Sequence, residues 1–133
     1  MKEDIKFPKV EGIVLAVVKD VINNEEAWDV YLINQNKQLL TNVLVASKGY
    51  GLKKGEQVKT STLRHHFDEL KAQDYVKVEP IQQELFGLSN EYWISFYIER
   101  TIYDKKYVFL PESITEDNFV TIPILNKKGV MLK

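Results

Sequence analysis

Two adjacent histidines, His65 and His66, are the side chains best suited to chemistry in this sequence. Histidine is the commonest neutral metal ligand and a frequent general base. Neighbouring residues of a strand point to opposite faces of a sheet, however, and no further metal ligands stand at a recognisable spacing. Ser61 and Asp68 would complete a hydrolytic triad with His65, but the GxSxG framework is missing. We therefore predict no catalytic residue, metal or cofactor, and keep a small enzyme using His65 or His66 as the third alternative.

The segment 49–55, GYGLKKG, is the nearest match to a phosphate-binding loop. Glycines let backbone N–H groups approach an anion, and lysines add positive charge. The spacing is GxGxxxG rather than GxGxxG, and an extended pattern follows where such loops require a helix. We favour a long solvated loop, with partner-binding candidates at Tyr50, Lys53, Lys54 and Arg64.

The stretch 92–109 contains seven aromatic rings in eighteen residues. In this stretch Tyr92, Ile94, Phe96 and Ile98 share one face of a strand, and the alternation predicts that they belong to the core. Trp93 and Tyr97 share the opposite face, which is either a second buried layer or an exposed patch for a partner. Basic neighbours keep a third interpretation open, in which exposed rings stack on single-stranded RNA. They are Arg100, Lys105 and Lys106.

Length and composition fit one domain over residues 1–133, because 44% of the residues are hydrophobic and 28% are charged. The absence of cysteine excludes disulfides and thiol chemistry. A net charge of −1 provides no global field for a polyanion. The first ten residues carry five charges, and the apolar run 13–18 is far too short to span a bilayer. We therefore expect a cytoplasmic protein without a membrane partner.

The hydrophobic pattern predicts strands throughout the chain. Residues 13–18 are apolar in both phases and should be covered on both faces or lie in the middle of a sheet, whereas residues 21–27 should form a loop. Strands 28–33 and 39–47 are expected to pair as a hairpin across the polar turn 34–37.

The polar stretch 68–74 predicts a corner where the chain passes from one sheet to another, with Leu70 and Tyr75 flanking it as in Ig-type sandwiches. In the strand that follows, Val76 and Val78 should face one way and Lys77 and Glu79 the other. Segment 80–87 fits a short helix or a hairpin, and we favour the hairpin. Two further hairpins are expected in the last third of the chain, joining residues 91–99 to 102–110 and 119–125 to 130–132. The fold class is all-β, a single antiparallel sandwich of seven to nine strands with an Ig-like or fibronectin-like arrangement.

Segments 59–66, KTSTLRHH, and 88–96, LSNEYWISF, with the KGY sequence before them, resemble a small bacterial family of about this whole length. Its members are sometimes labelled phenylalanyl-tRNA synthetase alpha subunit or a related protein. The resemblance implies membership of that family and an association with RNA or with a synthetase. It implies no catalytic residue, because the sequence lacks the Arg-x-Glu and glycine-rich motifs that bind ATP in class II synthetases.

These observations predict a non-catalytic intracellular binding or scaffold module. Its unidentified protein partner would meet Trp93 and Tyr97 or the segment 49–55. The alternative is an accessory protein associated with RNA or with an aminoacyl-tRNA synthetase. A homodimer is also open, because long strand edges and surface rings suit self-association.

Overall fold

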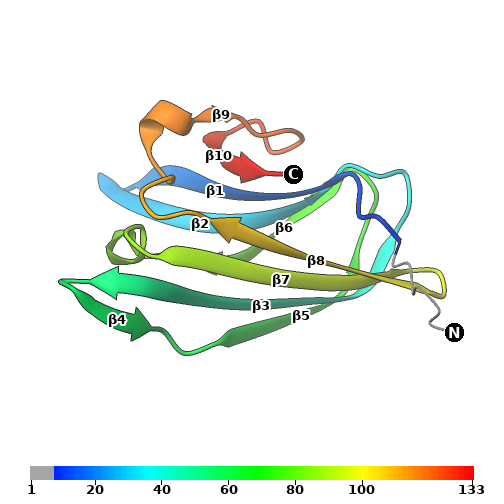
Figure 1. The fold of residues 1–133 in the computed structure, drawn as a ribbon. Coiled ribbons are helices and arrows are strands. Elements are labelled where there is room, and N and C mark those ends of the chain that lie inside the picture. Colours follow the sequence, from blue (N-terminus) through cyan, green and yellow to red (C-terminus); the bar gives the residue numbers. More distant parts are fainter. Residues whose placement is uncertain (1–7) are drawn as a thin grey trace, which may run out of the picture.

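The chain alternates between two antiparallel sheets that pack face to face, and this computed structural model describes residues 8–133 (Figure 1). The first sheet has the strand order β6-β2-β1-β10-β9, with β1 Ile13–Ile22, β2 Glu25–Asn34, β6 Asp74–Pro80, β9 Val120–Thr121 and β10 Lys128–Leu132. The second sheet has the order β4-β3-β7-β8, and β5 also pairs with β3. Its strands are β3 Leu40–Lys53, β4 Glu56–Lys59, β5 Leu63–Leu70, β7 Ser89–Ile98 and β8 Thr101–Phe109. The all-β antiparallel sandwich is thus confirmed, whereas its Ig-like or fibronectin-like arrangement stays a prediction.

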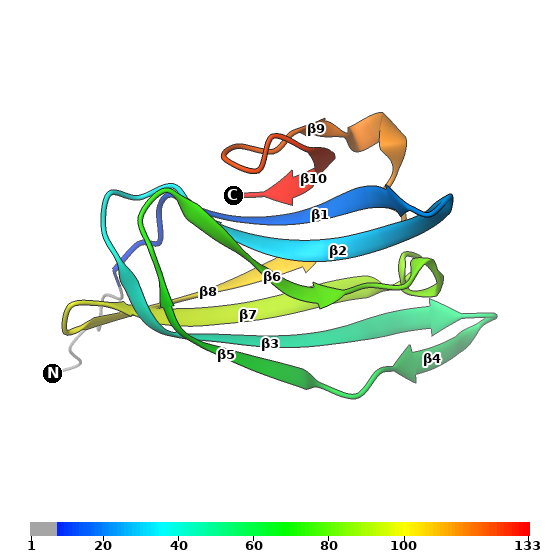
Figure 2. The same ribbon diagram turned by 180° about the vertical axis from the view of Figure 1, so that it is seen from behind.

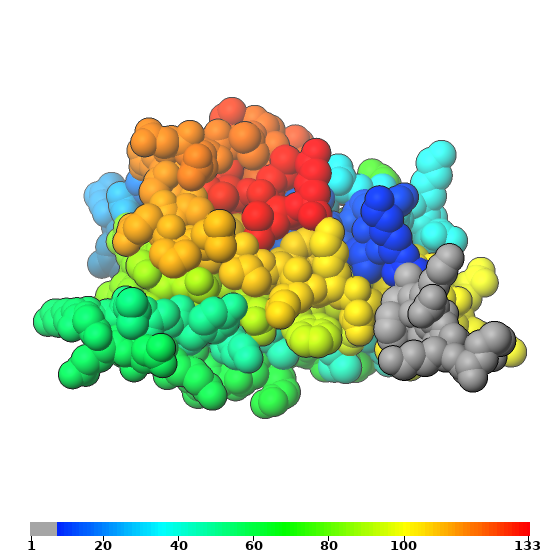
Figure 3. All heavy atoms as spheres, in the orientation of Figure 1, coloured from blue at the N-terminus to red at the C-terminus, as the bar shows by residue number. Residues whose placement is uncertain are grey.

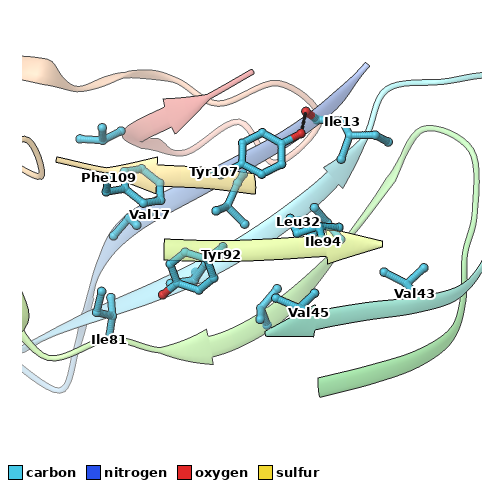
Figure 4. Packing of buried hydrophobic residues seen from close by; sticks show 14 of the residues in the cluster. Ile13, Val17, Leu32, Val43, Val45, Ile81, Tyr92, Ile94, Tyr107 and Phe109 are labelled. Carbon is cyan, nitrogen blue, oxygen red and sulfur yellow. Dashed lines mark hydrogen bonds between the residues drawn. The ribbon is translucent and has the colours of Figure 1, made fainter. Parts of the chain in front are cut away.

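The main core lies between the two sheets and follows from the alternation of each strand (Figure 4). Leu32 on β2 and Ile94 on β7 are completely buried in it. Tyr92 packs edge to face on Phe109 across the β7–β8 hairpin, with ring centroids 6.2 Å apart. The predicted core phase of β7 and the predicted pairing of β7 with β8 are therefore confirmed.

A second, smaller cluster covers the outer side of β1, which explains why residues 13–18 are apolar in both phases. The β9–β10 segment folds over this side, and Ile122 is completely buried against it (Figure 1). The other buried members of the cluster come from β1 and β2: Val14, Ala16, Val18, Tyr31 and Ile33. The short C-terminal hairpin expected from the sequence is present as β9 and β10, and β10 also pairs with β1.

The predicted corner between the sheets is confirmed at residues 71–73, where β5 of the second sheet leads into β6 of the first (Figure 2). Asn34, which is fully buried, donates its amide to the carbonyl oxygens of Leu70 at 3.2 Å and Lys71 at 3.1 Å. Tyr75 does not occupy the place of a corner tyrosine. It is 42% exposed and packs on Tyr31 at the outer surface of the first sheet.

Two expectations about the first half of the chain are wrong. Residues 21–27 are not a loop, because β1 and β2 continue to a two-residue turn at Asn23 and Asn24. Both asparagines have positive φ, 54° and 65°, which suits the tight turn of a twisted hairpin. Since β2 has β1 on one side and β6 on the other, it cannot pair with β3, which enters the second sheet.

The expected long loop at 49–55 is also wrong, because β3 runs through it to Lys53 and turns at Lys54 and Gly55 into β4. The positive φ angles of Lys54 and Gly55, 53° and 80°, make this turn tight. Segment 80–87 contains a 3-10 turn, η1 Gln83–Leu85, rather than the favoured hairpin, because β6 and β7 belong to different sheets. A second 3-10 turn, η2 Glu116–Asn118, precedes β9.

Within residues 8–133 no helix is long and apolar enough to cross a membrane. The charges at Lys2, Glu3, Asp4 and Lys6, which enter the expectation about the N-terminus, lie outside the described residues.

Candidate functional site

The outer surface of the second sheet carries the two aromatic residues that the sequence left open. Trp93 and Tyr97 alternate along β7 with the buried Tyr92, Ile94 and Phe96, so they point away from the core. Trp93 is 49% exposed and Tyr97 is 36% exposed. The two rings are therefore exposed and do not form a second buried layer, whereas a partner for this patch stays a prediction.

The strand register gathers further side chains around these rings. Ala46 lies beside Trp93 on one side, with Arg64 beyond it on β5, and Lys106 lies on the other side on β8. Two exposed aliphatic side chains extend the apolar area. Ile102 pairs with Tyr97, and Leu44 lies two residues before Ala46, on the same face of β3. We call this surface the outer face and define it by seven residues: Leu44, Ala46, Arg64, Trp93, Tyr97, Ile102 and Lys106.

A compact charge cluster borders the outer face. Glu91 lies under Tyr50, whose hydroxyl donates to its Oε1 at 3.3 Å. The ammonium groups of Lys48 and Lys106 lie 3.6 Å and 3.9 Å from the same carboxylate. Burial, and then the charge of Glu91, raises the pKa of Tyr50, so its hydroxyl remains a donor. Glu91 therefore forms ion pairs with both lysines, whereas Arg64 forms no ion pair with any residue in 8–133.

The structure brings together four of the six residues predicted to meet a partner. Tyr50 borders the outer face, which contains Arg64, Trp93 and Tyr97. Lys53 and Lys54 lie elsewhere, at the tip of the β3–β4 hairpin, which projects from one end of the molecule (Figure 3, green).

A polar cluster that the sequence did not predict lies between the sheets around Glu79. Val30 pairs with Glu79 and Tyr31 with Lys77, so Val78 is an extra residue, a β-bulge, in β6. The bulge turns Glu79 inward, so the expectation that Glu79 faces outward with Lys77 is wrong. Glu79 is only 9% exposed.

Three side chains of the second sheet contact this buried carboxylate. Ser47 donates to Glu79 Oε1 at 2.8 Å, and His65 Nε2 lies 2.7 Å from the same oxygen. The Tyr92 hydroxyl donates to Oε2 at 3.3 Å. Burial, reinforced by the charge of Glu79, raises the pKa of Tyr92, so this hydroxyl keeps its proton. Glu79 is thus a polar link from β6 to three strands of the opposite sheet.

The cluster does not have the geometry of a hydrolytic triad, in which histidine stands between the nucleophile and the acid. Here Glu79 stands between Ser47 and His65. His65 contacts Glu79, whereas His66, on the opposite phase of β5, has Nδ1 3.6 Å from an Asp68 oxygen. In the described part of the chain no group of three or more His, Asp or Glu side chains is arranged to hold a metal ion.

Comparisons with protein-family models, with curated proteins and with solved structures give no match. Any function of this chain is therefore inferred from the geometry of the outer face and of the Glu79 cluster.

Proposed function

We propose that this chain is a non-catalytic cytoplasmic binding module whose outer face binds a protein partner. The observation that carries this proposal is the exposure of Trp93 and Tyr97 next to two exposed aliphatic side chains on one sheet surface. Trp, Tyr and Arg are the residue types enriched among those that dominate binding energy, and all three types are present on this surface.

The charges around the rings favour a partner that presents apolar side chains next to a carboxylate. Arg64 is exposed and has no ion-pair partner within residues 8–133, so its guanidinium can donate two hydrogen bonds to a carboxylate in a bidentate pair. Lys106 is less available, because it approaches Glu91 and its ammonium lies 6.0 Å from the Trp93 ring centroid. An acidic and apolar protein surface is accordingly the expected ligand.

Affinity capture from native lysate, followed by binding to the purified partner, tests this proposal. Trp93→Ala should weaken binding by about 2 kcal/mol or more, roughly thirtyfold in Kd. Arg64→Ala should weaken it less strongly and remove part of its salt dependence. The matched control is Tyr75→Ala, which removes an exposed ring from the opposite sheet and should leave binding unchanged. Equal binding by wild type and folded Trp93→Ala protein would refute the proposal.

Sedimentation of the same two proteins tests self-association. If wild-type protein sediments as a dimer and Trp93→Ala protein as a monomer, the occupant of the outer face is a second copy of the chain.

RNA is the second candidate ligand, and one observation favours it. Lys106 and Arg64 flank Trp93 in one row across the sheet, so an exposed ring has cations on both sides. Bases stack on such rings while cations contact the phosphates. Family membership and association with a synthetase would agree with this candidate. Nuclease-sensitive capture, and RNA affinity that falls steeply with salt and is lost in Trp93→Ala and Lys106→Ala proteins, would favour RNA over a protein partner.

A further inference from the structure

A pocket of about 220 Å³ lies beside Glu79. Its walls come from β3, β5, β6 and β7, and from the connections that join β4 to β5 and β6 to β7. The outer face is on the other side of the second sheet, so the pocket is a separate site.

Glu79 retains acceptor capacity that the described residues do not use. A carboxylate offers about four acceptor positions. Two of its hydrogen-bond partners, Ser47 and His65, share Oε1. Oε2 receives only the long 3.3 Å contact from Tyr92 within residues 8–133. The second carboxylate oxygen can therefore accept a donor from a ligand.

Asn90 provides an independent indication of a ligand site. The residue is 4% exposed, and its Nδ2 donates to the carbonyl oxygens of Leu85 at 2.8 Å and Leu88 at 3.2 Å, which fixes the orientation of the amide. Its Oδ1 accepts no hydrogen bond from the described residues, although it lies in the wall of the pocket. A Cβ atom at Gly49 would lie 3.3 Å from this oxygen, so Oδ1 points toward the space that glycine leaves open.

The rest of the lining is mostly apolar or hydroxylic, and it also includes Lys48, whose ammonium lies 3.6 Å from Glu91 Oε2 in the charge cluster that borders the outer face. Leu63, Ile81 and Leu85 supply aliphatic surface, and Thr60 and Ser61 supply hydroxyl groups. Figure 4 shows the Tyr92 hydroxyl on the side of Ile81, away from Phe109. Two directed acceptors, one of them charged, beside an aliphatic wall suit a donor-rich cation on an apolar stem and repel an anion.

We propose that this pocket binds a protonated primary amine carried on an aliphatic stem. The ammonium donates to Oε2 of Glu79 and to Asn90 Oδ1, and the stem packs on the aliphatic wall. A free alkylamine and a lysine side chain of another protein share this chemistry.

Titration of the full chain with n-pentylamine, followed by amide chemical shifts, tests the proposal. We expect saturable shifts centred on Gly49 and Asn90, with n-pentanol and pentanoate at least about tenfold weaker, because both lack the cationic donor. N-acetyl-lysine methylamide is the second arm, and tighter binding of it than of pentylamine would identify a lysine side chain as the natural ligand. Equal shifts with pentylamine and pentanol would overturn the proposal.

Two variants act on different walls of the pocket. Glu79→Gln removes the charge with little change of shape and should weaken pentylamine binding at least about tenfold. Gly49→Ala places a methyl group against Asn90 Oδ1 without touching Glu79 and should reduce binding by steric exclusion. Glu69→Gln, on the exposed side of β5, is the control and should bind as wild type. Unchanged affinity in either folded pocket variant would overturn the proposal, and if Glu79→Gln does not fold, Gly49→Ala decides it.

Discussion

Glu79 on β6 and His65 on β5 connect the two sheets, with His65 Nε2 2.7 Å from Glu79 Oε1. The side chain of Glu79 is only 9% exposed, and removing a carboxylate from water is unfavourable unless donors surround it. Three side chains of the second sheet supply those donors. Weakening one member of such a cluster leaves the other buried polar groups without a full set of partners, which is unfavourable.

Replacing Glu79 with glutamine should therefore weaken the fold without abolishing it. The variant loses charge-assisted hydrogen bonds, and we expect the free energy of unfolding to fall by about 1–3 kcal/mol. Urea denaturation measures this difference. Glu69→Gln, which changes an exposed carboxylate on β5, should stay within about 0.5 kcal/mol of wild type. If the two variants are equally stable, the three contacts with Glu79 do not stabilise the junction of the sheets.

The same residue shows why the sequence predicts one surface and misses another. Strict alternation correctly separates Ile94 from Trp93, because β7 has a regular register with β8. Alternation fails at Glu79, because the extra residue Val78 moves the side chains that follow it to the opposite face of β6 from the one that alternation predicts. This bulge forms where β6 pairs with β2, a strand more than forty positions earlier, so no local sequence pattern around Val78 predicts it.

The misplaced hairpin between residues 28–33 and 39–47 has a similar explanation. Turn residues after β2 indicate correctly that the chain reverses, but they do not say which sheet receives β3. The side chain of Asn34 helps to fix the crossing, because it bonds the carbonyl oxygens of Gln38, Leu70 and Lys71. These contacts span 4 to 37 positions of sequence, and only the folded chain brings them together. The earlier turn at Asn23 and Asn24 had a usable local signal, since paired asparagines accept positive φ.

A single glycine allows β10 to approach β1. Gly129 pairs with Val18, and a Cβ atom at this position would lie 2.3 Å from the backbone oxygen of Val17. Gly129→Ala must therefore move β10 away from β1, and we expect destabilisation of about 1–3 kcal/mol. Hydrogen exchange should accelerate in β10 and in the outer cluster that the C-terminal segment covers.

Gly87→Ala is the matched control for this close approach. Its Cβ would meet only the end of the flexible Glu112 side chain at 3.3 Å, so stability should change by less than about 0.5 kcal/mol. Wild-type stability and exchange in Gly129→Ala protein would show that β10 does not depend on the close backbone contact.

Tyr107 gives the fold a specific response to high pH. Its buried hydroxyl donates to the Ile13 carbonyl oxygen at 2.7 Å, and burial raises its pKa above the ordinary value of 10.0 (Figure 4). At neutral pH, Tyr107→Phe should lower the free energy of unfolding by about 1 kcal/mol, because a buried carbonyl loses its donor. Above pH 10 the unfolded chain releases this proton while the folded chain retains it, so the wild type loses stability that the variant does not.

The stability difference between wild type and Tyr107→Phe should therefore be constant below pH 10, and it should shrink and then reverse as the pH rises further toward the folded-state pKa. Urea midpoints at pH 7, 9 and 10.5 measure this trend, and comparing the two proteins cancels the ionisation of the other tyrosines. Tyr75→Phe, at an exposed tyrosine with no hydroxyl contact among the described residues, controls for the removal of a hydroxyl group and should leave the urea midpoint at pH 7 close to that of wild type. A Tyr107→Phe difference that is independent of pH would mean that the Tyr107 hydroxyl ionises as readily in the folded chain as in the unfolded one.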